Sequence, residues 1–109
     1  MNASPERPSG AELIAAERQR QIGEEGYDAE HDAGETSGEL LDAARCYITA
    51  AEATWYSANC VTFHGGFRPE EGQPVDWPWM DGWKPSGDAV RDLVRAGALI
   101  AAEIDRLQA

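Results

Sequence analysis

A short stretch rich in tryptophan and proline constrains this chain more than any other part of it. Residues 74–85 read Pro-Val-Asp-Trp-Pro-Trp-Met-Asp-Gly-Trp-Lys-Pro and hold three of the four tryptophans. Proline fixes φ and withholds a backbone donor, so this stretch is neither an ordinary helix nor a central strand. Three indoles in an irregular segment must pack on something. The stretch is therefore predicted to be a long ordered loop that either closes one end of a small core or stacks on a ligand.

The rest of the chain has the apolar spacing of helices, which predicts an all-α fold with three main helices. They are expected at about residues 11–24, 38–57 and 87–108, after a flexible tail of residues 1–10 and within a single domain of residues 11–109. The expected boundary signals are Ser9 or Gly10 and then Gly26 for the first helix, a capping box of Thr36 and Glu39 for the second, and Ser86 for the third.

The second and third helices carry wide apolar stripes that are predicted to be buried. The stripes are Leu40, Leu41, Ala44, Tyr47, Ile48, Ala51 and Trp55, and then Val90, Leu93, Val94, Gly97, Ile100, Ala101, Ile104 and Leu107. Gly97 and Ala101 lie one turn apart and permit close helix packing. A chain of 109 residues can bury only a modest core, so such wide stripes predict an oligomeric bundle, a homodimer or larger.

The charge balance narrows the classes of partner. The net charge is −11, from 20 acidic residues against 9 Lys plus Arg, which argues against a broad basic face for nucleic acid. A small anionic ligand held by a few cations remains compatible with it. Cys46 and Cys60 have no metal-binding spacing and are expected to be reduced thiols. With no apolar run of membrane-spanning length and no signal peptide, we expect a cytoplasmic protein without a membrane partner.

Aromatic rings beside cations suggest a site for a flat base and its phosphates. The predicted ligand-binding residues are Trp77, Trp79, Trp83, Lys84, Arg91, Arg95, Arg18, His31 and Tyr27. In this interpretation the indoles and the tyrosine stack on the base, and the arginines hold phosphate by their fork geometry. The alternative is that the tryptophans only pack, while Asp88 pairs with Arg91 and Asp92 with Arg95.

Acidic residues near the start of the second helix offer a possible metal site. Glu35, Glu39 and Asp42 lie on adjacent turns, and carboxylates at this spacing can hold Mg²⁺. The alternative is that they favour the helix dipole and cap. No catalytic residues are assigned, because no nucleophile elbow or Cys–His signature is present. Binding without catalysis and without a cofactor is therefore expected.

Several spaced blocks resemble a group of small all-α proteins encoded by phages and prophages. The blocks are residues 17–22 (ERQRQI), 25–27 (EGY), 30–32 (EHD), 38–40 (GEL), 77–79 (WPW), 83–85 (WKP) and 91–100 (RDLVRAGALI). Small phage proteins of this size include sponges that sequester nucleotide immune signals, of the anti-Thoeris and anti-CBASS types, and these are oligomeric and non-catalytic. By analogy, we expect sequestration of an ADP-ribose-derived or cyclic nucleotide in the cytoplasm of an infected or lysogenic bacterium.

A weaker similarity is to the all-α nucleotide pyrophosphohydrolases of the MazG type. These enzymes hold Mg²⁺ with two acidic motifs on facing helices. Here only Glu39 and Asp42 match one motif, and a partner motif is not evident. A Mg²⁺-dependent pyrophosphohydrolase is thus the alternative function, and an acidic inhibitor that binds a host protein is the second alternative.

Overall fold

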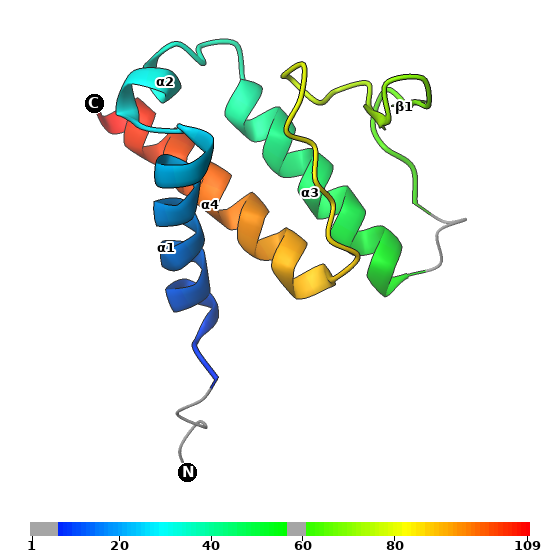
Figure 1. Ribbon diagram of the computed structural model, residues 1–109, viewed down its shortest axis with the longest axis horizontal. Coiled ribbons are helices and arrows are strands. Elements are labelled where there is room, and N and C mark those ends of the chain that lie inside the picture. Colours follow the sequence, from blue (N-terminus) through cyan, green and yellow to red (C-terminus); the bar gives the residue numbers. More distant parts are fainter. Residues whose placement is uncertain (1–6, 57–60) are drawn as a thin grey trace.

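The computed structural model describes residues 7–56 and 61–109, which fold mainly into helices (Figure 1). Two long helices, α3 (Glu39–Trp55) and α4 (Ala89–Gln108), run side by side, and α1 (Gly10–Arg20) crosses α4 on its other flank. The shorter elements are the π-helix η1 (Gln21–Glu25), α2 (Ala29–Ala33) and an antiparallel pair of two-residue strands, β1 (Phe67–Arg68) and β2 (Gln73–Pro74).

The expected boundaries of the first helix are confirmed at both ends. Ser9 forms a capping box with Glu12: the Glu12 amide donates to Ser9 Oγ at 3.1 Å, and the Ser9 amide donates to Glu12 Oε1 at 2.8 Å. Gly26 ends the helical run in the left-handed region, with φ 77°. The last turn before it is a π-turn, which the sequence did not indicate. Residues 1–6 of the expected tail lie outside the described residues.

The predicted caps of the other two long helices are wrong. The residue before α3 is Gly38, with φ 86° and no side-chain cap, whereas Glu39 Oε1 accepts from the Ser37 amide at 2.7 Å. Helix α4 is capped by Asp88, whose carboxylate accepts the Arg91 amide at 3.3 Å. A carboxylate thus takes the capping role predicted for the Ser86 hydroxyl, whereas no side chain takes the role predicted for Thr36. Helix α3 ends at Trp55. Residue 57, the expected end of this helix, lies outside the described residues.

The core is built from the small residues of α3 and α4 around a few larger side chains. It contains Leu40, Ala43, Ala44, Cys46, Tyr47, Trp77, Ala96, Leu99 and Ala102. The stripe predicted to be buried on α4 is largely exposed: Val90, Leu93, Ile100, Ile104 and Leu107 all reach solvent, as does Trp55 on α3. Alanines on the opposite side of α4 let α3 approach closely, and this side became the core. Helical spacing correctly located the large apolar residues on one side of α4, but it did not show that the opposite side packs on α3.

Gly97 lies at the contact between α1 and α4 of the same chain. A Cβ atom built on Gly97 would lie 2.6 Å from Cδ1 and 2.9 Å from Cγ1 of Ile14, too close for a side chain. The absence of a side chain at Gly97 therefore lets α1 dock against this helix. The predicted close packing at Gly97 is real, but its partner is α1.

The tryptophan-rich loop is ordered and docked, as predicted. Trp77 is only 5% exposed, meets Tyr47 edge to face, and donates its indole N–H to the Asp81 carbonyl at 2.9 Å. At the end of the loop, the fully buried Asp92 accepts the Ser86 amide at 3.0 Å and the Ser86 hydroxyl at 2.9 Å.

In the described part of the chain, none of the helices has the length and hydropathy needed to cross a membrane.

Candidate functional site

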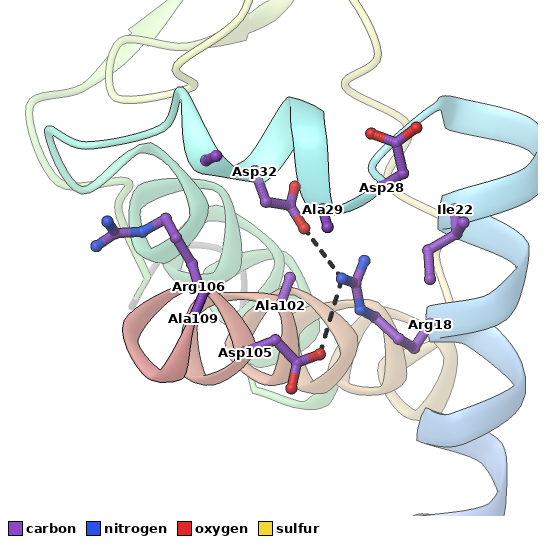
Figure 2. Close-up of a pocket in the computed structure, with 10 residues that line it drawn as sticks. Arg18, Ile22, Asp28, Ala29, Asp32, Ala102, Asp105, Arg106 and Ala109 are labelled. Atoms are coloured by element: carbon purple, nitrogen blue, oxygen red, sulfur yellow. Dashed lines mark hydrogen bonds and ion pairs between the residues drawn. The ribbon is translucent and has the colours of Figure 1, made fainter.

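Arg18 lies at the centre of a polar network that joins α1, α2 and α4 (Figure 2). Its guanidinium donates from Nη1 to the Tyr27 carbonyl at 2.7 Å and from Nη2 to Asp32 Oδ2 at 3.0 Å. Asp105 of α4 approaches the same Nη2 at 3.9 Å. Side-chain exposure is 11% for Arg18 and 3% for Asp32, so this ion pair is shielded from water. Within the described residues, Arg18 Nε is buried and has no hydrogen-bond partner.

A chain of hydrogen bonds leads from this ion pair to the tryptophan loop. His31 Nδ1 lies 2.8 Å from Asp32 Oδ1, and His31 Nε2 lies 3.1 Å from Glu35 Oε1. The same Glu35 oxygen accepts the Trp79 indole N–H at 2.9 Å. Each His31 ring nitrogen thus lies within hydrogen-bond distance of a different carboxylate. The network therefore ties α1 and α2 to a loop residue far away in the sequence.

Local sequence explains how these groups come together. Gly26 reverses the chain after η1, and Asp28 then caps α2 by accepting the His31 amide at 2.9 Å. One turn of α2 then points His31 at the aromatic rings: it stacks on Tyr27 at 4.9 Å and 22°, and Tyr27 lies 5.0 Å from Trp79. Burial raises the pKa of Tyr27 well above its usual range, with a further contribution from the nearby acid Glu25. Tyr27 is thus neutral at physiological pH.

Beside the ion pair lies a cleft of about 410 Å³ between α1, α2 and the end of α4, which we call the Arg18 cleft. Its lining is Arg18, Ile22, Asp28, Ala29, Asp32, Ala33, Ala102, Asp105, Arg106 and Ala109. Figure 2 shows Arg18 and Arg106 at opposite ends, with Asp32, Ala102 and Asp105 between them. Arg106 is held by Glu103 through bonds of 2.7 and 2.9 Å. The Arg18 cleft therefore combines an apolar floor with charges of both signs.

Four of the nine predicted ligand residues meet around this network: Arg18, Tyr27, His31 and Trp79. Of these four, Arg18 lines the Arg18 cleft and the other three do not. Two others, Trp83 and Arg95, form a neighbouring cluster. Trp83 packs on Tyr47 at 4.9 Å, and the Arg95 guanidinium lies over the same ring at 5.5 Å. Arg95 donates to the Lys84 carbonyl and contacts Asp92 Oδ1 at 3.4 Å.

The remaining predicted residues are placed less favourably for a ligand. Trp77 is enclosed by Tyr47, Trp79 and Trp83, so it offers no free face. Lys84 is 65% exposed and lies 3.7 Å from Glu25. Arg91 is exposed at the start of α4 and joins neither group. The packing interpretation thus accounts for Trp77, and the Asp92–Arg95 pair predicted as its companion is present.

The three acids predicted as an alternative metal site have separate partners. Glu35 accepts from Trp79 and faces His31, Glu39 accepts from the Ser37 amide, and Asp42 pairs with Arg45 at 2.8 Å. Within residues 7–56 and 61–109, no group of three or more His, Cys, Asp or Glu is arranged to hold a metal ion.

Sequence reasoning did not select the other charged residues of the Arg18 cleft. These are three acids, Asp28, Asp32 and Asp105, and the base Arg106. Asp32 is the neighbour of the selected His31 in the sequence, and this adjacency could have indicated it. Asp105 and Arg106 lie near the end of α4, and only the fold brings them to α1.

Comparison with known protein families, with curated proteins and with solved structures finds no match to this chain.

Proposed function

We propose that the chain binds a small nucleotide in the Arg18 cleft and holds it without chemical conversion. The observation that carries this proposal is the Arg18 guanidinium, fixed by Tyr27 and Asp32 in the wall of a cleft of about 410 Å³. Pockets of roughly 300–1,000 Å³ accommodate small molecules and cofactors. A pre-positioned guanidinium is the side chain best suited to phosphate recognition.

The charges of the Arg18 cleft favour one kind of nucleotide over another. Two arginines and three aspartates line it, which gives 2 − 3 = −1 for these five side chains. A triphosphate would meet excess negative charge there, whereas carboxylates accept hydrogen bonds from ribose hydroxyls and exocyclic amines. The floor of Ile22, Ala29, Ala33 and Ala102 can pack against a base. An ADP-ribose-derived compound, with two phosphates and many hydroxyls, therefore fits better than a nucleoside triphosphate.

The biological role follows from the resemblance to small phage proteins. A chain that binds such a compound and releases it intact would act as a sponge, lowering the concentration of an immune signal inside the infected cell. The test is incubation with cyclic and linear ADP-ribose compounds, cyclic oligonucleotides and nucleoside triphosphates, followed by heat denaturation and analysis of the released material. Recovery of an intact ADP-ribose-type ligand supports the proposal. Cleaved products would indicate the pyrophosphohydrolase, and no depletion of any compound would favour the protein inhibitor.

A pair of matched variants tests the location. Arg106→Gln should weaken binding about tenfold or more, because a charge-assisted hydrogen bond contributes roughly 1.5–3 kcal/mol and about 1.4 kcal/mol is a decade. Arg45→Gln is the control: Arg45 forms the same kind of i,i+3 pair, with Asp42 on α3, outside the Arg18 cleft. Equal affinity of both variants and the parent would remove the cleft from the proposal.

A further inference from the structure

One side of the layer formed by α3 and α4 is apolar and uncovered. On α4 five large apolar side chains are between 39% and 67% exposed, and on α3 Trp55 is 76% exposed. Leu41 and Ile48 of α3 are partly exposed as well. We call this surface the open face; its residues are Leu41, Ile48, Trp55, Val90, Leu93, Ile100, Ile104 and Leu107.

The open face has the spacing of a helix-packing surface on both helices. Leu41, Ile48 and Trp55 are seven residues apart, and so are Leu93, Ile100 and Leu107. At about 3.6 residues per turn, each set forms a line along one side of its helix. The two lines meet where α3 ends and α4 begins, at an apolar hollow of about 360 Å³ lined by Trp55 and Leu93 among others.

The other sides of α4 are already occupied. Arg95 packs on Tyr47 beneath the tryptophan loop, and α1 docks at Gly97. Ile104 follows Arg95 by nine residues, so it projects from the helix about 180° away from it. The open face therefore lies opposite the loop. Helix α1 borders it at Gly97, seven residues from Val90 and Ile104, and leaves these two side chains 60% and 50% exposed.

We propose that the open face binds the same face of a second copy of this chain, so that α3 and α4 of two copies form a four-helix arrangement. This inference is independent of the nucleotide. Heptad-spaced apolar lines suit helices that pack at small crossing angles, the geometry of four-helix bundles. A twofold axis pairs one surface with itself, so an uncharged face is matched to an uncharged face.

The size of the open face is adequate for a stable dimer. Helices of 17 and 20 residues are about 26 and 30 Å long, and packed helices lie about 8–10 Å apart. Two adjacent helices thus present roughly 500 Å² in outline, and the accessible surface of their ridged side chains is larger. This is comparable with the ~800 Å² that each partner buries in a typical interface.

Charge favours a second copy over an anionic partner. The chain has a net charge of −11, yet the eight residues of the open face are uncharged, and the hollow at its end adds one charged side chain, Glu52. Nucleic acid or an anionic lipid surface would be repelled by the rest of the molecule and would find no cation on this face. Two copies of the chain bury the open faces and leave most acids in solvent.

The mass of the full chain in solution tests the proposal. Light scattering at micromolar concentration should give twice the monomer mass of 11.8 kDa. Ile100→Lys and Ile104→Lys should each raise the dimer dissociation constant at least tenfold, because each buries an ammonium group in the contact. Helix content measured by circular dichroism should not change, because both side chains are exposed in the single chain. Met80→Lys is the control, because Met80 is 98% exposed in the loop and lies off the open face.

The outcomes are decisive for the open face. A parent chain that is monomeric at micromolar concentration overturns the proposal, whether or not it binds neutral lipid vesicles or another protein. A dimer that survives both lysine substitutions places the contact elsewhere and also overturns it. If one variant does not fold, the other gives the answer. Dimerisation without nucleotide binding would separate this inference from the proposed function.

Discussion

A substitution at Gly97 measures how tightly α1 is docked on α4. In an open helix interior, replacing glycine by alanine stabilises a protein by roughly 0.5–1 kcal/mol, because alanine has less conformational freedom to lose. Here the new methyl would lie 2.6 Å from Ile14 Cδ1 and 2.9 Å from Cγ1, so α1 or the Ile14 side chain must move. Overpacking of this kind costs about 1–3 kcal/mol. Gly97→Ala should therefore lower the free energy of unfolding by about 0.5–2 kcal/mol, the difference between the two.

The sign of the effect should reverse when Ile14 is shortened. In an Ile14→Ala background the obstructing atoms are gone, and Gly97→Ala should now stabilise by roughly 0.5–1 kcal/mol. Urea unfolding of the four chains of this double-mutant cycle gives the coupling directly; a change of 1 kcal/mol moves the midpoint by about 1 M or somewhat less. Gly23→Ala is the matched control, because no atom lies within 4 Å of its added Cβ, and it should stabilise in both backgrounds. Equal effects of Gly97→Ala with and without Ile14 would refute the docking of α1 described above.

Two further predictions concern buried groups. Asp92→Ala should lower the free energy of unfolding by about 3–5 kcal/mol in urea titrations, because the Ser86 donors and the Arg95 guanidinium lose a fully buried acceptor. The control is Asp42→Ala, which breaks an exposed ion pair and should lower it by less than about 1 kcal/mol. Equal losses in the two variants would contradict this account. Burial raises the pKa of the Cys46 thiol from 9.0 to about 12 in the folded chain. As the pH rises from 9 towards 12, the unfolded chain therefore loses the thiol proton before the folded chain does, and the free energy of unfolding should fall. Urea midpoints of the parent and Cys46→Ala chains across this range test it, and a loss equally steep in both would assign the effect to other groups, such as the buried Tyr47.

Local signals in the sequence identified those parts of the fold that depend on a few neighbouring residues. The Ser9–Glu12 cap and the Gly26 stop need only residues within one turn, and the prolines of the loop excluded regular structure there. Helix α2 was missed because five residues carry too little periodicity, and its only signal is the Asp28 cap. The core side of α4 was misassigned because large apolar residues dominate the pattern, while Ala96 and Ala102 are read as neutral.

The candidate site was partly predictable for a different reason. Residue type alone selected Arg18, His31 and Trp79, since arginine, histidine and tryptophan in such a short acidic chain stand out. Their partners Asp32 and Glu35 were not selected as ligand groups, because acids are common here and their pairing depends on where α2 and the loop meet. A contact such as Glu35–Trp79, which joins residues 44 positions apart, is a property of the fold and not of local spacing.

The π-turn at Gln21–Glu25 makes the length of this segment a constraint in itself. A π-turn accommodates one residue more than an α-helix would, and it sits between Arg18 and the Tyr27 carbonyl to which Arg18 donates. Deleting any one of these five residues would restore a regular helix and rotate Arg18 by about 100° relative to Tyr27 and Asp32. Point substitutions keep the number of residues and so keep this register. Among natural variants of this chain, changes of identity should therefore be tolerated at the exposed positions Gly23 and Glu24, whereas single-residue insertions and deletions should be excluded.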